Sequence, residues 1–285
     1  MNADKNRIRE IRVYPCPVVG LIGWPVEHSR SPLMHNAAFA ARGLDWEYVL
    51  LPTPPDQLRA ILDRIRRGEL AGANVTIPHK SAVMPLLDEI DSVAQAVGAV
   101  NTIVVRDGRL IGRNTDVIGF TRALSEMNVD VGGKPCAVLG AGGAARAVVH
   151  ALGELGGHVT IYARDVAKAR ALIGPDGHAR SLNDLARLER ETTLVVNATP
   201  VGMAPHADAS PWPDDVRFPA SALAFDLIYN PRRTCWMDQA ERCGARSING
   251  LAMLLYQGAA AFEMWTGQAA PIDVMRAALE RVEAS

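Results

Sequence analysis

The chain has 285 residues and a mass of 30.6 kDa, and its 30 lysines and arginines against 31 aspartates and glutamates give a formal net charge of −1. Hydrophobic residues make up 48% and charged residues 21% of the sequence, which excludes a disordered chain, a collagen-like fibre and a disulfide scaffold. Since a pI near 6.7 provides no basic field for polyanions, we expect no nucleic-acid partner.

The four cysteines form no Cys-x-x-Cys pair, which argues against a disulfide framework and a zinc ribbon. We expect reduced thiols and no bound metal. The first ten residues are charged where a signal peptide needs an apolar segment, and no uncharged apolar stretch approaches the ~18 residues of a membrane span. The sequence therefore predicts a soluble, cytoplasmic chain that does not bind membranes, and we expect a monomer or a homodimer.

Short apolar runs alternate with helical patterns along most of the chain, which is typical of an α/β fold. Asp107-Gly108, between the apolar runs 102–105 and 110–112, predicts a two-residue hairpin turn. The other elements expected in the first part are, in order, a strand at 17–23, a helix with Ser31 as N-cap and Pro32 at its first position that ends at Gly43, a strand at 46–51, a helix that buries Leu58, Ile61, Leu62 and Ile65, and a strand at 73–77.

The second part has the pattern of a doubly wound, Rossmann-type nucleotide-binding unit. Its expected elements are a helix at 117–127, strands at 135–139, 158–163, 193–197 and 222–227, and two final helices at 250–265 and 272–282. The sequence therefore predicts two α/β lobes with a cleft between them.

A glycine-rich turn links the strand at 135–139 to the following helix. Gly140-x-Gly142-x-x-Ala145 matches the G-x-G-x-x-A fingerprint, in which glycines permit a tight turn and let the backbone approach a pyrophosphate at the helix N-terminus. A loop that needs glycine only for positive φ is the alternative, and the strand–turn–helix context favours a dinucleotide. The expected contacts are Gly140, Ala141, Gly142, Gly143 and Ala144.

The end of the next strand distinguishes the two nicotinamide cofactors. An acidic side chain about 20 residues after the fingerprint would bind the ribose hydroxyls of NAD, whereas this chain has Ala163-Arg164-Asp165 followed by Lys168. Arg164 can hydrogen bond to a 2′-phosphate, and Lys168 adds charge. Asp165 is either the NAD-type acid or the N-cap of a helix that begins at Val166. We favour the cap, and hence NADP over NAD.

Polar side chains of the first part follow the predicted strands. Ser29 and Ser31 precede a helix, so their hydroxyls and its N-terminus can hold a carboxylate, although Ser31 can also be a simple cap. Asn74 and Thr76 alternate with apolar residues and therefore share one face of a strand. Lys80 follows in the next turn.

Lys80 and Asp116 are candidates for proton transfer. Asp116 precedes a predicted helix, where capping is the usual role of an aspartate. A dehydrogenase, however, must supply a proton to the alkoxide that forms when a carbonyl accepts a hydride. Lys80 can donate this proton, and Asp116 can orient the lysine.

Together these motifs resemble the shikimate dehydrogenase family over nearly the whole chain. Each motif is short, but their order and spacing are specific. The matching segments are His28-Ser29-Arg30-Ser31-Pro32, Asn74-Val75-Thr76-Ile77-Pro78-His79-Lys80, Gly98-Ala99-Val100-Asn101-Thr102, Asn114-Thr115-Asp116, the run GAGGAARA at 140–147, Asn197-Ala198-Thr199 and Met253-Leu254-Leu255-Tyr256-Gln257.

The resemblance implies reversible, NADP-dependent reduction of 3-dehydroshikimate to shikimate, on the route to chorismate and the aromatic amino acids, with Lys80 and Asp116 as the catalytic pair. It implies a substrate domain of residues 1–115 and 252–285, to which the C-terminal helices return, and a Rossmann-type NADP domain of residues 116–251. The implied substrate contacts are Ser29, Ser31, Asn74, Thr76, Asn101, Tyr229 and Gln257, and the implied cofactor contacts beyond the glycine turn are Arg164, Lys168, Asn197 and Thr199.

Two other hypotheses stay open. Arg164-Asp165 differs from the Asn-Arg-Thr turn common in the family, so NAD is an alternative cofactor, and a quinate/shikimate dehydrogenase with NAD preference is the alternative activity. A cofactor-sensing paralogue with weak turnover is the third hypothesis. Lys80 and Asp116 argue against it, because a sensor needs no proton donor.

Overall fold

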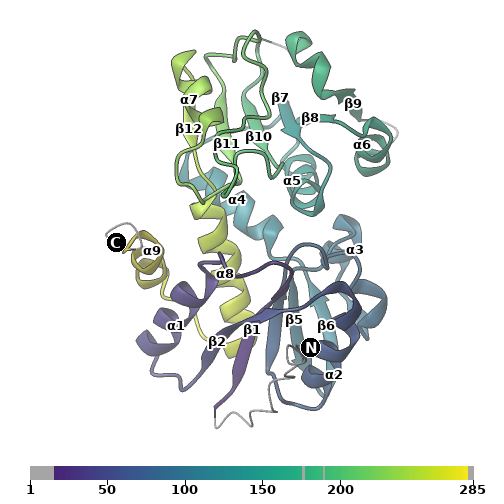
Figure 1. Ribbon diagram of the computed structural model, residues 1–285, viewed down its shortest axis with the longest axis vertical. Coiled ribbons are helices and arrows are strands. Elements are labelled where there is room, and N and C mark those ends of the chain that lie inside the picture. Colours follow the sequence, from purple (N-terminus) through teal and green to yellow (C-terminus); the bar gives the residue numbers. More distant parts are fainter. Residues whose placement is uncertain (1–15, 175–176, 189, 282–285) are drawn as a thin grey trace, which may run out of the picture.

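The computed structural model describes residues 16–174, 177–188 and 190–281, which form two lobes, each with a β-sheet and helices packed around it (Figure 1). The predicted α/β class and the two lobes are confirmed. None of the described helices is long and apolar enough to cross a membrane.

The sheet of the first lobe brings several polar segments to one edge. Its described strands have the order β2-β1-β3-β5-β6-β4. β1 is parallel to β2 and β3, whereas β5 is antiparallel to both β3 and β6. The start of β5 and the end of β6 therefore lie beside the carboxyl end of β3. These strands are β1 Val18–Gly23, β2 Glu47–Pro52, β3 Gly72–Val75, β4 Glu89–Ile90, β5 Thr102–Arg106 and β6 Arg109–Arg113.

The described strands of the second lobe are all parallel, in the order β12-β11-β10-β7-β8-β9. The chain runs outward from β7 to β9 and then crosses to β10 on the other side of β7, which is the strand order of the doubly wound dinucleotide fold. Ligands bind such sheets at the carboxyl ends of the strands where the order reverses, here between β7 and β10. The strands are β7 Pro135–Leu139, β8 His158–Ala163, β9 His178–Ser181, β10 Leu194–Asn197, β11 Leu223–Asp226 and β12 Arg246–Ile248.

The helices cover the two sheets and link them (Figure 1). They are α1 Ser31–Ala41, α2 Leu58–Arg66, α3 Ser92–Val97, α4 Asp116–Glu126, α5 Gly143–Glu154, α6 Val166–Ile173, α7 Cys235–Arg242, α8 Leu251–Thr266 and α9 Ile272–Glu280, with 3₁₀ turns at Pro55–Gln57, Met84–Leu86 and Leu182–Arg187.

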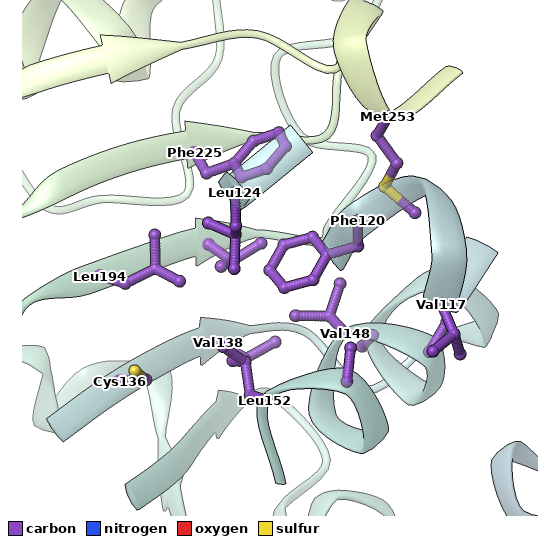
Figure 2. Close-up of a cluster of buried hydrophobic side chains, with 14 of the residues drawn as sticks. Val117, Phe120, Leu124, Cys136, Val138, Val148, Leu152, Leu194, Phe225 and Met253 are labelled. Carbon is purple, nitrogen blue, oxygen red and sulfur yellow. The ribbon is translucent and has the colours of Figure 1, made fainter. Parts of the chain in front are cut away.

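α4 begins at the end of the first lobe and packs in the core of the second. Figure 2 shows Phe120 and Leu124 of α4 among apolar side chains of α5, β7, β10 and β11, with Met253 of α8 beside them. The rings of Phe120 and Phe225 stack with their centroids 5.3 Å apart. Gly119 permits a close helix crossing, because a Cβ there would lie 2.7 Å from the Met253 carbonyl oxygen. α4 and α8 therefore cross in direct contact.

α8 and α9 return to the first lobe, as expected. Phe262 of α8 and Met275 of α9 are buried in one apolar cluster with Phe39 of α1. The Trp265 indole N–H donates a hydrogen bond to the Ile103 carbonyl of β5 at 3.0 Å. These contacts bring the C-terminal part of the chain against a sheet formed by its N-terminal part.

Several boundaries differ from the prediction by one or two residues, and two of the differences lie beside predicted site residues. Arg30, not Ser31, is the N-cap of α1. Ser31 is the first helical residue, and its hydroxyl accepts a hydrogen bond from the Ser29 hydroxyl at 3.2 Å instead of capping the helix. β3 ends at Val75, two residues early, because the Thr76 carbonyl accepts a hydrogen bond from the His79 N–H at 2.9 Å and the chain turns.

Candidate active site

A cavity of about 270 Å³ lies between the lobes. The first lobe contributes the carboxyl edge of its sheet and α8, and the second contributes Ala144 of α5, Met203 and Tyr229. A larger hollow of about 500 Å³ at the starts of β7 and β8 contains no residue predicted for a site. The inter-lobe cavity is lined by all of the residues predicted for catalysis and substrate binding, namely Ser29, Ser31, Asn74, Thr76, Lys80, Asn101, Asp116, Tyr229 and Gln257.

Lys80 and Asp116, 36 residues apart in the chain, meet in this cavity. The Lys80 Nζ lies 2.6 Å from Asp116 Oδ2, and the two side chains are 15% and 8% exposed. Lys80 extends from the turn after β3, and Asp116 is the first residue of α4. The antiparallel pairing of β3 with β5 and of β5 with β6 produces this meeting, because it returns the chain to the end of β3 just before α4 begins.

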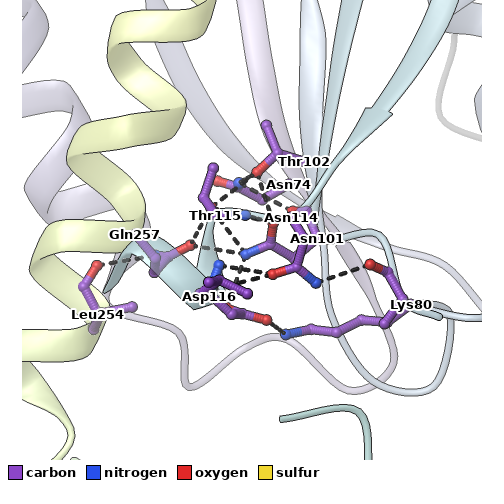
Figure 3. Close-up of polar contacts among 11 residues, drawn as sticks. Asn74, Lys80, Asn101, Thr102, Asn114, Thr115, Asp116, Leu254 and Gln257 are labelled. Atoms are coloured by element: carbon purple, nitrogen blue, oxygen red, sulfur yellow. Dashed lines mark hydrogen bonds and ion pairs between the residues drawn. The ribbon is translucent and has the colours of Figure 1, made fainter. Parts of the chain in front are cut away.

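The Asp116 carboxylate is held from both sides (Figure 3). Asn101 Nδ2 donates to Oδ1 at 2.8 Å, while Lys80 donates to Oδ2. The Asn114 amide oxygen accepts the Asp116 N–H at 3.0 Å, and its NH₂ donates to the Ala99 carbonyl at 2.8 Å. Thr115 is the N-cap of α4 and makes no side-chain capping bond, so Asn114 binds the first helical N–H and the Asp116 carboxylate faces Lys80 and Asn101.

A buried polar network lies behind the pair. The Thr102 hydroxyl accepts from Asn74 Nδ2 at 3.0 Å and donates to Asn101 Oδ1 at 3.0 Å, and the Thr115 N–H donates to the same Asn101 oxygen at 2.7 Å. Gln257 of α8 accepts from Asn101 Nδ2 at 3.4 Å (Figure 3). Since a satisfied buried network is rigid, the amide groups that line the cavity are fixed before any ligand arrives.

A second group of hydroxyls also lines the cavity. Ser29 and Ser31 are hydrogen bonded to each other, and Tyr229 reaches them from the second lobe. Burial raises the pKa of Tyr229 above its usual value, while a hydrogen bond with Ser29 and the charge of Arg30 oppose the rise. The tyrosine therefore keeps its proton near neutral pH. Three hydroxyl donors beside a guanidinium suit an anionic group such as a carboxylate.

The glycine turn lies at the carboxyl end of β7, next to β10. Gly140 has φ of +103°, and its N–H donates to the Tyr162 carbonyl of β8 at 2.8 Å. Gly142 is the N-cap of α5, makes no side-chain capping bond, and has open space where a Cβ would be. The first N–H groups of α5 are therefore available to a pyrophosphate, as the fingerprint requires.

The turn after β8 has the chemistry expected for a 2′-phosphate. Asp165 is the N-cap of α6, and its carboxylate accepts the Lys168 N–H at 2.9 Å. This capping bond turns the acidic group onto its own helix. Arg164 and the Lys168 side chain are exposed on the same turn. The residues present therefore fit NADP, and the alternative role of Asp165 as an acid for NAD is not supported by its geometry.

Residues 21–103 match the family model of the shikimate dehydrogenase substrate binding domain, and residues 250–280 match that of the shikimate 5′-dehydrogenase C-terminal domain. A protein from Desulforamulus reducens named shikimate dehydrogenase (NADP(+)) is 47% identical, over 93% of this chain and 94% of its own length. The chain belongs to the shikimate dehydrogenase family. The predicted family is therefore confirmed, and with it the prediction of an NADP-dependent oxidoreductase.

Solved structures of the family agree with this membership. A shikimate dehydrogenase from Thermus thermophilus, crystallised with NADP(H) and shikimate, is 39% identical with a TM-score of 0.85 and covers 93% of this chain and 99% of its own. A quinate dehydrogenase from Corynebacterium glutamicum, crystallised with NAD, is 30% identical with a TM-score of 0.83 and covers 92% of this chain and 98% of its own.

Sequence reasoning missed several residues that organise this site. Asn114, Thr102 and Thr115 hold Asp116 and Asn101, as described above. Tyr48 of β2 is buried, and its hydroxyl donates to Asn74 Oδ1 at 2.9 Å. Asn114 and Thr115 directly precede Asp116 in the sequence, and this adjacency could have indicated their role. Nothing in the sequence links Tyr48 to Asn74.

Asn197 lies differently from the other residues predicted to contact the cofactor. Its side chain is buried; Nδ2 donates to Asp226 at 3.0 Å, and Oδ1 accepts the Thr199 hydroxyl at 2.7 Å. The Asn197 amide is therefore hydrogen bonded to groups of its own lobe, where it fixes Thr199 and the end of β11. Thr199 lies directly over the glycine turn, since a Cβ at Gly140 would be 3.1 Å from its methyl group.

Proposed function

We propose that this enzyme catalyses the reversible, NADP-dependent reduction of 3-dehydroshikimate to shikimate, with Lys80 and Asp116 as its proton-transfer pair. The observation that carries the proposal is the 2.6 Å contact between the Lys80 Nζ and Asp116 Oδ2 inside a cavity to which both lobes contribute. An amine and a carboxylate that are both largely buried and are paired with each other keep the net charge of the site near zero, which limits the cost of burying them.

The chain's own residues supply the proton and hold the substrate. Lys80 Nζ donates a proton to the carbonyl oxygen that becomes a hydroxyl, and accepts it back in the oxidation direction. Asp116 Oδ2 directs the ammonium, while Asn101 keeps the carboxylate from turning away. General acid–base catalysis of this kind contributes about 10²–10⁴-fold to the rate.

Two groups of polar side chains that line the cavity suit the carboxylate and the ring hydroxyls of the substrate. Ser29, Ser31 and Tyr229 bind its carboxylate, because hydroxyl donors are gathered there. The ring hydroxyls are bound by a group of amide and hydroxyl side chains, namely Asn74, Thr76, Asn101 and Gln257.

NADP, when bound, supplies or accepts the hydride. The glycine turn with the start of α5 holds its pyrophosphate, Arg164 and Lys168 hold its 2′-phosphate, and Thr199 contacts it next to Gly140. Burial of the reacting groups between the lobes excludes water from the transfer.

We assign residues 1–115 and 252–285 to a substrate domain and residues 116–251 to a cofactor domain. The packing of α8 against β5 and of α4 into the second core supports these limits. We further propose a monomer or homodimer, to be distinguished by sedimentation, and a cytoplasmic location. The four cysteines, none of which forms a disulfide in the described structure, are consistent with a reducing compartment.

Initial rates with shikimate and with quinate, each with NADP and with NAD, test the proposal. We expect the highest kcat/KM for shikimate with NADP. The highest value for quinate with NAD would instead support the quinate/shikimate dehydrogenase hypothesis. Binding of NADP without turnover of either acid would support the cofactor-sensing hypothesis.

A further inference from the structure

α5 contacts the first lobe away from the two chain crossings between lobes. The chain crosses between β6 and α4 and again between β12 and α8, whereas α5 lies against α3 on another side (Figure 1). Both Gly143, at the start of α5, and Arg146, one turn later, take part in this contact. The helix that begins at the glycine turn therefore has its own contact with the lobe that carries Lys80.

The Arg146 side chain contacts Gly98, the residue that ends α3. A Cβ at Gly98 would be 3.1 Å from Arg146 Nη1, so the guanidinium occupies the space beside the glycine. Gly98 is the C-cap of α3 and has φ of +67°, in the left-handed region that favours glycine. A cation at the carboxyl end of a helix is also electrostatically favourable. Neither residue has a role in the function proposed above, although both belong to motifs of the family resemblance.

The segment at Gly98 is hydrogen bonded to the Lys80 turn. The Ser81 hydroxyl donates to the Gly98 carbonyl at 3.0 Å, and the Val100 N–H donates to the Lys80 carbonyl at 2.8 Å. On the other side, a Cβ at Gly143 would lie 3.5 Å from Lys80 Cδ, which is ordinary van der Waals contact. The backbone and side chain of Lys80 are thus placed between the α3 C-cap and the start of α5.

We propose that Arg146 is a positioning residue, which sets the distance between the start of α5 and Lys80 through its contact with Gly98. This role rests on the proposed function, because it matters only if Lys80 is the proton donor. Arg146 touches neither reacting group. It acts by fixing the two elements that carry the proton donor and the pyrophosphate-binding turn.

Arg146→Ala tests this role. We expect kcat to fall about 10- to 100-fold, since displacement of reacting groups by about 1 Å can cost 10² in rate, while the KM for shikimate changes less than about two-fold because no substrate contact is removed. Arg146→Lys should recover part of kcat, because the cation is kept. Arg242→Ala on α7, which removes an exposed arginine of the same lobe, is the control and should keep the wild-type kcat.

A second measurement, on the enzyme without cofactor or substrate, tests the same role independently of the kinetics. In the free enzyme, amide hydrogen exchange of the segment 92–102 should be faster in Arg146→Ala than in the wild type and in Arg242→Ala, because the α3 C-cap loses its neighbour. Unchanged exchange together with an unchanged kcat would overturn the proposal.

A double-mutant cycle with Gly98→Ala tests the contact itself. The added methyl group is strained by φ in either background, but it displaces a guanidinium only when Arg146 is present. The loss of kcat from Gly98→Ala should therefore be smaller in the Arg146→Ala background, whereas additive losses would overturn the proposal. Lys80→Ala distinguishes failure of the proposed function from failure of the role of Arg146. A wild-type kcat in Lys80→Ala refutes the proposed function. A reduced kcat in Lys80→Ala together with wild-type behaviour of Arg146→Ala refutes only the role of Arg146.

Discussion

His35 should make the folded state lose stability as the pH falls. Its side chain is fully buried in α1, and burial lowers its pKa from 6.5 to about 3. The ring stacks on Tyr48 with centroids 4.4 Å apart, and neither ring nitrogen has a hydrogen-bond partner among the described residues. Protonation would therefore place an uncompensated charge in an apolar cluster.

The sign and size follow from the two pKa values. The unfolded chain binds the proton near pH 6.5 and the folded chain only near pH 3, so the stabilisation is complete above pH 6.5 and is lost as the pH falls towards 3. The loss is about 2 kcal/mol at pH 5 and about 5 kcal/mol when complete.

Urea unfolding of the wild type and of His35→Phe, at pH 8 and at pH 5, measures this effect. The absolute stability of the variant is irrelevant, because only the difference between the two pH values is compared. We expect the wild type to lose about 2 kcal/mol more than the variant over this interval. Equal pH dependence of the two proteins would refute the assignment of the lost stability to His35.

Three further outcomes are expected. Asp226→Asn should abolish an opposing pH effect. Burial raises the pKa of Asp226 to about 6 from 3.8, so the stabilisation that it contributes is present at low pH and is lost as the pH rises from about 4 to 6. In urea unfolding, the free energy of unfolding of the variant should therefore gain about 1 kcal/mol less than that of the wild type when the pH is lowered from 8 to 5. Lys80→Ala should lower kcat by about 10²–10⁴ with little change in the dissociation constant of shikimate, measured by calorimetry; a fully active variant would remove Lys80 from the mechanism. Arg164→Ala should weaken NADP binding about 10-fold or more while NAD binding is kept, and equal losses for both cofactors would show that Arg164 does not contact the 2′-phosphate.

Local chemistry was sufficient to predict many elements. Asp107 and Gly108, both with positive φ, form the expected hairpin turn between β5 and β6. α2 buries the four predicted residues because its apolar positions follow the helical period. β7 and β8 have the predicted limits, since each is a short apolar run.

Several elements that were not predicted lack such patterns. β9 and β12 are edge strands of three or four residues with exposed or half-buried side chains, so their sequences carry no strong strand signal. α3 has six residues, which is too short for a clear helical period. Such elements form because a neighbouring strand or helix is present, and the sequence of the segment alone does not encode the neighbour.

In the site too, some features could be predicted from the sequence and others could not. The order of motifs was enough to predict that Lys80 and Asp116 converge, but not which groups hold them. Thr115, rather than Asp116, is the N-cap of α4, Asn114 accepts the Asp116 N–H, and Thr102 joins Asn74 to Asn101. These choices depend on the direction in which each amide or hydroxyl points, which is decided by contacts between segments that are distant in the chain.

The close crossing of α4 and α8 at Gly119 has a mechanical consequence. When one rigid body turns about another, points near the axis travel least, and Asp116 lies on α4 less than one helical turn from this crossing. A rotation of the second lobe about the crossing would therefore displace the Asp116 carboxylate less than parts of that lobe farther from the crossing. The contact between Lys80 and Asp116 would then be little disturbed by such a rotation.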